Sequence, residues 1–572
     1  MVDTFLTRLY GGLLGLFFLV LVPVPVDGLG GGPIVPVAFH LHWVVMVSII
    51  LVGLLRALSR GVVILSSFIK YFLLFILLVL LASWFQPPIN GHAFMFQMAG
   101  LVGGLLFLMA VQQFPLNEQQ RRWVLWILLL AGVIQAGIGL TEIHTVAEAG
   151  ISGTLFHKNI LATFLATGLV IALLFMMENP WSHWKSLLFF LISSLLMTTL
   201  VLASSRMGLG GLVVGCLVLA GARWEAFGTV WKRVLMIWGL ALLVVVGAIA
   251  GLQQQERVQA VASKISATPT LVMEVAKGEV PAGDKFGRLM HWEIAWTLFL
   301  EQPLWGQGIG GYSSRYRDLV RTRYPDANNT NEHAYQPYNE LMRQLVESGA
   351  GAGVGMLLMV GALLVQLFRL GRQEGGTLLA LMVSIALYFG VGGLLYDTAV
   401  LWFTALLLVS FPTASAVREM AIIDSVGVRT GLATVGVGLF VGTVLFLVGT
   451  ARAQVEMTRY VQLLTSNRIS RGALLQPALD NLYLRQMATR LFMDVTLKIA
   501  VLRQDRATLQ QFLEWSKKER HLWPNYVMYA NEGRALNAMG ETRAAETLVT
   551  EGLRLYPLQP ELTAVQKEMR QN

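Results

Sequence analysis

Three ionisable side chains stand beside apolar runs of the sequence, where charged groups are costly. Arg206 lies in LVLASSRMGLGGLVVG, between two runs that are apolar enough for a membrane interior. Arg288 lies at the start of a helical pattern, where a cation does not stabilise the helix dipole and an anionic ligand is one reason for its presence. His333 lies in NEHAYQPYNELMRQLVESG, and histidine is the usual general base near neutral pH. These residue types indicate proton transfer and anion binding at a membrane edge.

Each of these residues also has a simpler structural interpretation. Arg206 could extend to the membrane surface as an ordinary loop arginine. His333 could only form hydrogen bonds within a polar loop. Arg315 belongs to RYRDLVRTR, a basic cluster whose simpler interpretation is a face turned to solvent or to lipid headgroups. The residues alone leave these alternatives open.

No metal and no other cofactor is expected. The segment around His333 lacks an H-x-x-H or H-E-x-x-H pair, and the loop that contains it lacks an Asp-x-Asp pair. The glycines of WGQGIGGY form a turn without the G-K-[ST] of a phosphate-binding loop. The single cysteine, Cys216, lies in an apolar run and permits neither an intramolecular disulfide nor a cysteine metal cluster.

The composition indicates the elements that must position these residues. Of the 572 residues, 55% are hydrophobic and only 13% are charged, whereas soluble proteins carry about 25% charged residues. Apolar runs long enough for a spanning helix recur about 13 times. The expected fold is therefore all-α, a polytopic membrane helix bundle with one large loop and a helical tail. The net charge of +9 is attributed to cytoplasmic loops, so no nucleic-acid partner is expected.

The expected organisation has four parts. They are N-terminal transmembrane helices (1–252), a catalytic loop (253–349), C-terminal transmembrane helices (350–450) and a soluble helical tail (451–572). Lys and Arg are in excess in alternate loops, which predicts a cytoplasmic N-terminus. An odd number of spans then puts the large loop, the turn near Arg206 and the tail on the opposite side. The first apolar segment has no A-x-A cleavage site and is interpreted as a retained helix.

Two local patterns predict how helices pack. Apolar residues in MHWEIAWTLFL fall at helical spacing and predict an amphipathic helix in the large loop. Its expected apolar side consists of Trp292, Ala295, Trp296 and Phe299. Gly211 and Gly215 have the spacing at which membrane helices approach closely.

The tail has its own pattern. YANEGRALNAMGETRAAETLVTEGLRLYPLQPEL matches the small-residue and turn positions of a tetratricopeptide repeat, with a turn at Gly540 and a closing proline at Pro557. An earlier segment ends in a similar way at Trp523 and Pro524. Such a tail could be a capping or assembly module, or it could dock an acceptor, and both interpretations stay open.

Three segments together resemble the bacterial superfamily of O-antigen ligases, O-antigen polymerases and protein O-oligosaccharyltransferases. GTLFHKNILATFL (153–165) is similar to the family's G-T-F-x-N-x-N-x-x-A segment, and SSRMGLGGL (204–212) is similar to its S-x-S-R segment. PLWGQGIGGY, followed by PYNELMRQLVESGAGAGVG, resembles P-x-x-G-x-G-x-x-x-F followed by H-x-H-N-x-x-L-x-x-x-x-E-x-G. The resemblance covers about residues 1–450.

The resemblance implies a reaction. Family members transfer a glycan from an undecaprenyl-pyrophosphate carrier to an acceptor hydroxyl, without nucleotide or metal. It implies that Arg206 and Arg288 hold the pyrophosphate and that Lys158 and Asn159 line the donor site. Further expected substrate contacts are Asn339, Glu340, Glu347 and Arg315.

One departure affects the base. The H-x-H-N element of the family has become QPYN, so that Gln336 and Tyr338 stand where the family has histidines. Either His333 takes the role of base from another backbone position, or Tyr338 does so with an altered pKa. A tyrosine with an ordinary pKa near 10 is a poor base, which favours His333. A degenerate, inactive member is a third possibility.

The layout of the chain is closest to that of protein O-oligosaccharyltransferases, including those that modify pilins, because of the tail. The expected partners are the undecaprenyl-pyrophosphate-linked glycan, a periplasmic acceptor protein and membrane lipids. The expected location is the bacterial inner membrane, with the large loop and the C-terminus in the periplasm. Ligation to lipid A core, glycan polymerisation and, less favoured, transport or flipping remain as alternatives.

Overall fold

The computed structural model is almost entirely helical in the part of the chain that it describes. That part comprises residues 2–24, 37–144, 151–155, 157–178, 182–251, 288–323, 336–391, 399–413, 417–421, 425–465, 474–522, 525–557 and 559–571. The chain forms two compact units. The first unit consists of Met1–Ile76, Met98–Pro281 and Gly355–Ala451, and the second of Leu77–Gln97, Ala282–Val354 and Arg452–Asn572. The predicted four-part division follows the sides of a membrane, and it stays a prediction.

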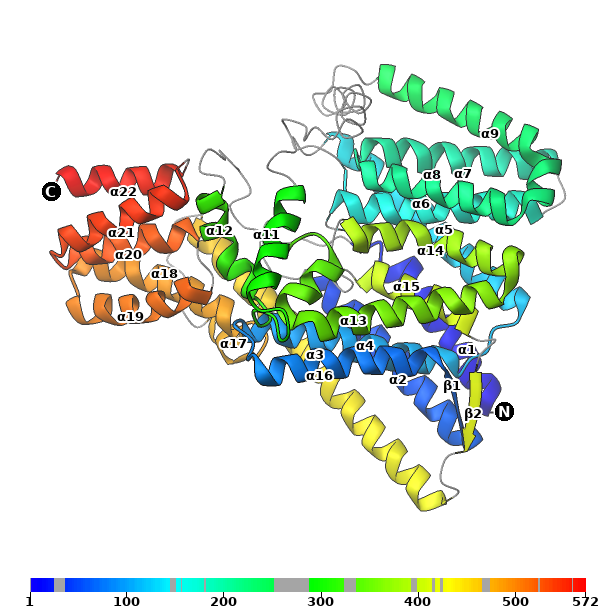
Figure 1. Cartoon of the computed structure of the whole chain (residues 1–572), viewed down its shortest axis with the longest axis horizontal. Helices are drawn as coiled ribbons and strands as arrows, with labels where there is room; N and C mark the ends of the chain where they lie inside the picture. The colour runs from blue at the N-terminus through cyan, green and yellow to red at the C-terminus, as the bar shows by residue number, and fades with distance from the viewer. Residues whose placement is uncertain are drawn as a thin grey trace. The chain divides into compact units, whose positions relative to one another are not determined.

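Eleven helices in the described ranges are long and apolar enough to cross a membrane (Figure 1). They are α1 (Val2–Gly15) with its π-helical continuation η1 (Leu16–Leu21), α2 (Val37–Arg60), α3 (Phe68–Phe85), α4 (Gly91–Gln112), α5 (Glu118–Thr141), α6 (Lys158–Glu178), α7 (His183–Leu202), α9 (Trp224–Gly251), α13 (Glu340–Arg369), α14 (Gly371–Val391) and α16 (Val426–Thr465). Two shorter apolar helices, α8 (Arg206–Ala222) and α15 (Ala399–Thr413), occupy further predicted spans. The predicted all-α, polytopic membrane fold is confirmed.

Helix α6 forms the centre of the first unit. Its residues from Ile160 to Met177 are all buried, and α5, α7, α8 and α14 pack around it. Small residues allow this packing. A Cβ atom on Gly208 would lie 2.5 Å from the Cβ of Ala162 on α6, and one on Gly211 would lie 3.0 Å from Ser384 on α14. The close approach predicted for the α8 glycines is therefore present, and α8 is held between α6 and α14.

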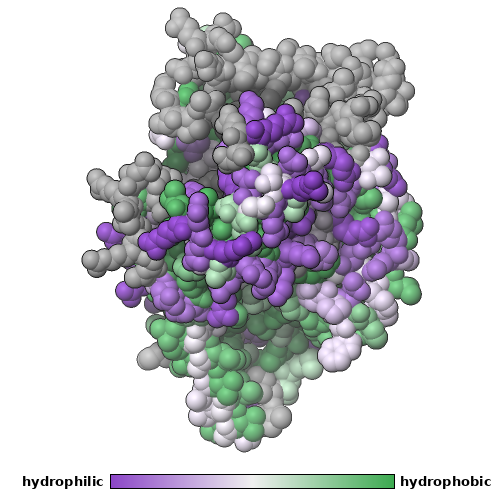
Figure 2. All heavy atoms as spheres, turned by 90° about the vertical axis from the view of Figure 1, so that its left-hand side faces the viewer, coloured by the Kyte–Doolittle hydropathy of each residue, from purple (hydrophilic) through white to green (hydrophobic). Residues whose placement is uncertain are grey.

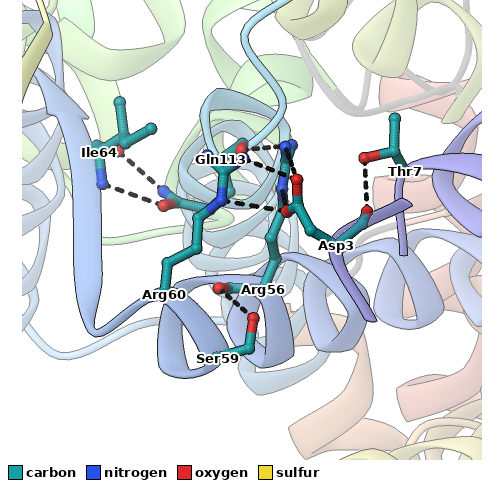
Figure 3. Close-up of polar contacts among 7 residues, drawn as sticks. All are labelled: Asp3, Thr7, Arg56, Ser59, Arg60, Ile64 and Gln113. Carbon is teal, nitrogen blue, oxygen red and sulfur yellow. Dashed lines mark hydrogen bonds and ion pairs between the residues drawn. The ribbon is translucent and has the colours of Figure 1, made fainter. Parts of the chain in front are cut away.

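The charged residues at one end of the first unit are paired (Figure 3). Arg56, which is buried, and Arg60 both hold the Asp3 carboxylate, with nitrogen–oxygen distances of 2.7 and 2.8 Å. Arg56 also donates a hydrogen bond of 2.6 Å to the carbonyl oxygen of Gln113. The Gln113 side chain bonds both the backbone nitrogen and oxygen of Ile64. Ile64 belongs to β1 (Val62–Ser66), which pairs antiparallel with β2 (Val417–Ala421), so this end is closed by a small sheet.

More ion pairs lie at the same end of the first unit. Glu178, at the end of α6, pairs with Arg122 at 3.1 Å and with Arg223 at 2.7 Å. Arg121 pairs with Glu374 at 2.9 Å. Helices α6 and α8 run in the same direction, because α7, which connects them in the sequence, runs the other way. The first residues of α6 and α8 therefore lie together at the end of the unit opposite to these ion pairs.

The second unit contains the described part of the large loop. Helices α11 (Arg288–Glu301) and α12 (Gly311–Arg323) pack together with the first turns of α13. The predicted helix is present, but its predicted apolar face is wrong in part. Trp296 is 45% exposed, whereas Ile294 and Leu298 are fully buried. Helical spacing is compatible with either face when both carry apolar residues, and the packing partners of α11 select the Ile294 and Leu298 side.

The tail in the second unit is a series of helices. It contains α17 (Gln476–Asp480), α18 (Arg485–Arg503), α19 (Arg506–Leu522), α20 (Tyr526–Ala538), α21 (Thr542–Leu555) and α22 (Pro560–Gln571). Gly540, with φ +83°, makes the predicted turn between α20 and α21. Ala535 and Ala545 are fully buried in the helix packing, while the outer surface of the tail is mostly hydrophilic (Figure 2). The assignment to tetratricopeptide repeats stays a prediction, as does the pair Trp523 and Pro524, which lies outside the described residues.

Candidate functional site

The glycine-rich turn (303–312) and the first part of α13 are joined by hydrogen bonds in the second unit. These two segments are called the interlocked motifs below. The backbone nitrogen of Gln307 donates to the carbonyl oxygen of Val346 at 2.7 Å. The backbone nitrogen of Ala350 donates to the carbonyl oxygen of Pro303 at 2.7 Å. The Glu347 carboxylate accepts a hydrogen bond of 3.0 Å from the backbone nitrogen of Gly310. The glycine-rich turn therefore binds directly to the first part of α13.

Glycine is required where the two motifs meet. Gly349 has φ +75° and ψ −175°, a backbone conformation that is essentially restricted to glycine. A Cβ atom there would lie 2.2 Å from the carbonyl oxygen of Leu304. Gly306 also has φ +75°, and its Cβ would lie 2.6 Å from the backbone of Glu347. Gly349 also interrupts α13, so the first turns of this helix end at this residue.

A buried polar network surrounds Arg343 on the first turns of α13. Its guanidinium lies 2.9 Å from Glu347 and 3.7 Å from Glu340, and it donates to the Gln97 side chain of α4 at 2.7 Å. Gln344 donates to Glu340 at 2.6 Å and accepts from Gln97 at 3.3 Å. All five side chains are buried. Removing one charge from such a network leaves another unpaired, so Glu340 and Glu347 stabilise the buried Arg343 guanidinium. Their predicted contact with substrate stays a prediction.

Tyr338 and Asn339 lie directly before this network. Asn339 accepts a hydrogen bond of 2.9 Å from the backbone nitrogen of Met342 and thereby caps α13. Tyr338 has φ +53°, which is uncommon for a residue with a side chain. The half-buried Tyr338 is therefore held in a strained conformation by the start of a well-capped helix.

A buried histidine that the sequence-based prediction did not include contacts Tyr338. The His291 ring lies 5.0 Å from the Tyr338 ring, edge to face, and is stacked on Tyr316 at 4.8 Å. Its Nδ1 is 2.8 Å from the hydroxyl of Tyr312. Burial, together with the nearby Arg288 guanidinium, lowers the pKa of His291 to about 4. The imidazole is therefore neutral near pH 7, and burial raises the pKa of the Tyr312 hydroxyl in the same cluster.

The two loop arginines of the prediction have different surroundings. Arg288 is the first residue of α11 and is half-buried, close enough to His291 to affect its pKa. Arg315 is exposed and pairs with Glu301 at 2.6 Å. Arg315 therefore connects α12 to the end of α11, whereas Arg288 belongs to the surroundings of the buried histidine.

The remaining predicted residues lie in the first unit, at the shared end of α6 and α8. Lys158 and Asn159 begin α6 and are half-buried. Arg206 begins α8 and is exposed, and it makes no hydrogen bond or ion pair with the residues that the structure describes. The close contact of Gly208 with Ala162, one turn inside each helix, brings the two helix starts together. Both helix N-termini favour an anion at this end.

The segment before α6 is fixed by the buried side chain of Gln135. Its amide nitrogen donates to the Thr154 hydroxyl at 2.6 Å, and its amide oxygen accepts from the Thr154 backbone nitrogen at 3.3 Å. Gly153, directly before Thr154, has φ +58°. A Cβ atom on Gly153 would lie 2.8 Å from the Gln135 side-chain oxygen. The Gly-Thr pair of the motif therefore positions the start of α6.

The structure brings together part of the predicted site within each unit. One group, in the second unit, consists of Tyr338, Asn339, Glu340, Glu347 and Arg288. The other group, in the first unit, consists of Lys158, Asn159 and Arg206. His333 lies outside the described residues, so its role as base stays a prediction. The missed residue, His291, precedes Ile294, Ala295 and Leu298 by three, four and seven positions. That spacing on the buried face was the available signal for an internal histidine.

Comparison with models of protein families gives a match for part of the chain. Residues 187–358 match the family model described as O-antigen ligase, while no curated protein matches the chain. The matched segment includes Arg206, Arg288 and both interlocked motifs. Members of this family are glycosyltransferase-like enzymes that act on lipid-linked sugars. Residues 187–358 are therefore similar to the O-antigen ligase family, within the superfamily of O-antigen ligases and O-antigen polymerases.

Proposed function

We propose that this protein transfers a glycan from an undecaprenyl-pyrophosphate carrier to a Ser or Thr hydroxyl of a periplasmic protein, without a metal ion. The match to the O-antigen ligase family supports the coarser assignment, a membrane glycosyltransferase of ligase or polymerase type. The finer assignment to protein acceptors rests on the long helical tail, which follows the last long apolar helix in the sequence and has a mostly hydrophilic surface.

The proposed reaction is a single displacement at the anomeric carbon. The base takes the proton of the acceptor hydroxyl, and the oxygen forms a bond to the anomeric carbon. The bond from that carbon to the pyrophosphate oxygen breaks, and the lipid pyrophosphate leaves with the bonding electron pair. The sugar configuration is inverted. Arg206 and Arg288 stabilise the charge on the leaving group, and Lys158 adds a third cation.

Two residues remain candidates for the base. A histidine side chain commonly serves as a general base near neutral pH, and His333 lies outside the described residues. Tyr338 stands at the position of the family histidine and contacts the neutral ring of His291. The proposal assigns the base to His333 and the shaping of the acceptor site to Tyr338 and Asn339.

The observation that carries the proposal is the environment of Arg206. Its guanidinium is exposed and has no carboxylate partner among the described residues, whereas Arg122 and Arg223 at the other end of the same bundle are paired with Glu178. An unpaired guanidinium at two helix N-termini suits a pyrophosphate.

Co-expression with a complete lipid-linked glycan pathway tests the function. Mass spectrometry of periplasmic proteins is expected to find the glycan on Ser or Thr only when this chain is present, and not with Arg288→Ala. Glycan on lipid A core, or longer glycan chains on the carrier, would instead identify a ligase or a polymerase. Unchanged proteins and lipids would contradict the proposal.

A further inference from the structure

The second unit contains a pocket of about 370 Å³. None of the residues named for the reaction above lines this pocket. The start of α4 forms one wall, and α19 together with the first turns of α18 and the residues before them forms the others. Pockets for small ligands are typically about 300–1,000 Å³ in volume, so this one is large enough for a ligand group. The side chains that matter below are those of His92, Tyr483, Gln486, Thr489, Trp515 and Glu519.

Aromatic rings give the pocket an apolar platform. Trp515 and Tyr483 are both half-buried, which leaves part of each ring open to the pocket. The His92 ring lies 4.5 Å from the Tyr483 ring, tilted by 43°. The face of an aromatic ring carries partial negative charge and attracts the C–H groups on the flat side of a sugar ring. A peptide side chain would also fit an aromatic wall, so the polar groups must decide between the two.

The polar groups of the pocket are suited to neutral hydroxyls. Glu519 is 6% exposed, forms an ion pair with Arg490 and accepts a hydrogen bond of 3.2 Å from Gln486. Its charge is therefore already neutralised, and Gln486 is held in place. Gln486 then offers its amide to a ligand, and Thr489, which donates to the carbonyl oxygen of Arg485 at 2.7 Å, offers its hydroxyl oxygen as an acceptor. Arg485 on the same wall donates to the carbonyl oxygen of Leu479 at 3.1 Å, so the pocket has no cluster of cations for a phosphate.

One ring nitrogen in the wall lacks a protein partner. The Nε2 atom of His92 is buried and forms no hydrogen bond with the described residues. Buried polar atoms are nearly always hydrogen-bonded, so an orphaned atom at a pocket wall indicates a ligand or water partner. A sugar hydroxyl can serve, because it both donates and accepts.

The pocket lies close to the interlocked motifs within the same unit. Gln97, which binds Arg343 and Gln344, follows His92 by five residues on α4, a distance of about 7 Å along the helix. We infer that the pocket is a subsite for a sugar residue of the transferred glycan, beyond the sugar that reacts. The inference rests on the proposed function. The sugar can belong to the lipid-linked donor or, in a polymerase, to an acceptor glycan.

Kinetics with donors of two lengths test the subsite. The full-length protein in lipid nanodiscs receives a lipid-linked glycan of full length or one cut back to its first sugar. In Trp515→Ala and Gln486→Leu, the KM for the long donor is expected to rise at least tenfold, and the ratio of the long-donor to short-donor KM is expected to rise with it. His92→Phe keeps the ring but removes Nε2, and a smaller increase is expected.

A matched control separates the pocket from general damage to the tail. Phe492 is an aromatic residue of α18 that is 43% exposed and does not line the pocket. Phe492→Ala is expected to keep both KM values, with unfolding midpoints of all variants close to that of the wild type.

The outcomes are distinguishable from one another. If only the KM for an acceptor glycan rises, the pocket still binds a sugar, and that sugar belongs to the acceptor. The subsite is rejected if only the KM for the acceptor protein changes. It is also rejected if all three pocket variants keep the wild-type ratio of long-donor to short-donor KM. If the wild type transfers no glycan, the proposed function fails. Calorimetric titration with the free oligosaccharide released from the donor then tests the pocket by itself, and equal binding to wild type and Trp515→Ala rejects it.

Discussion

The arginines of this chain differ in what surrounds each guanidinium. Arg343 is buried and holds Glu340 and Glu347, so its charge is used within the fold. Arg206 is exposed, with no ion pair among the described residues. A guanidinium that is already paired offers little to a substrate, whereas an exposed one can bind two phosphate oxygens side by side. The exposed guanidinium of Arg206 therefore suits the pyrophosphate of the proposed donor, whereas that of Arg343 does not.

The forked geometry of Arg206 gives the first prediction. Arg206→Lys keeps the charge but loses the paired hydrogen bonds, so the transfer rate is expected to fall by about 10- to 100-fold. The control is Arg372→Lys, since Arg372 is exposed but bonds the carbonyl oxygen of Gly221 at the other end of α8. Wild-type rates in Arg206→Lys would support the interpretation of Arg206 as an ordinary loop arginine.

The buried histidine predicts a pH dependence of stability. The pKa of His291 is about 4 in the folded protein and 6.5 when unfolded, so the unfolded chain binds more protons between these values. The free energy of unfolding is unaffected above pH 6.5 and falls as the pH drops toward 4, by about 2 kcal/mol at pH 5. In His291→Gln, which can still bond Tyr312, the decrease in unfolding midpoint between pH 7 and pH 5 is expected to be smaller. Equal decreases would show that His291 does not titrate in this way.

The sequence predicted only some of these residue-level features. The turn at the glycines of WGQGIGGY was predicted from local residue types, because chain reversal is a local property, whereas the interlock of this turn with Glu347 and Gly349 was not predicted. His291 was missed because its partners come from positions 312, 316 and 338. Contacts between distant segments depend on tertiary packing, which a single sequence does not specify.

At the scale of elements, the central feature is the seam between the glycine-rich turn and α13. It is built from backbone hydrogen bonds and requires the chain to pass very close to itself at Gly349. The pairing of α12 with α21 adds a second fixed point, since buried Arg317 donates to the carbonyl oxygen of Leu555 at 2.8 Å and lies over the Tyr556 ring. The tail therefore contributes to the order of the loop helices within the second unit.

A pair of glycine substitutions tests the seam. Gly349→Ala would bring a Cβ atom to 2.2 Å from the Leu304 oxygen at a backbone angle that alanine avoids, at a cost of at least 1–3 kcal/mol. The unfolding midpoint and the transfer rate are both expected to fall. Gly351→Ala, two residues away, meets only Leu78 at 3.8 Å and is expected to behave as wild type. Similar effects of the two substitutions would contradict the account of the seam.

The elements themselves were largely predictable, and their orientation was not. Apolar runs of about 20 residues gave the membrane helices, and Gly540 gave the turn between α20 and α21. The buried side of α11 was predicted only in part, because both of its faces are apolar: Ala295 is buried as predicted, whereas Trp296 is exposed. Only the neighbouring α12 and α13 decide which face becomes the core.

At the scale of the whole molecule, the helix count bears on topology. In the described part of the chain, eleven long apolar helices and the shorter α8 and α15 give an odd number of candidate spans. The two termini of the chain are then expected on opposite sides of the membrane. Because Arg206 at the α6–α8 end would face the carrier pyrophosphate, the proposed function requires that end and the tail to be periplasmic.

Tags at the two termini test this arrangement. A tag at the C-terminus is expected to be accessible to a periplasmic protease in cells with intact inner membranes, and a tag at the N-terminus is expected to be protected. The N-terminal tag serves as the internal control for membrane integrity. If both tags are protected, the tail is not periplasmic, and it then gives no support to a protein acceptor.

Glycan transfer to a protein is tested by following both products of one reaction. Purified protein in proteoliposomes is given a labelled lipid-linked glycan and a periplasmic acceptor protein, and the released undecaprenyl pyrophosphate and the glycosylated protein are quantified. The account predicts equal amounts of the two products from the wild type and a strong loss of both in Arg206→Ala. An intact donor with the wild type, or glycan released without its appearance on protein, would contradict it.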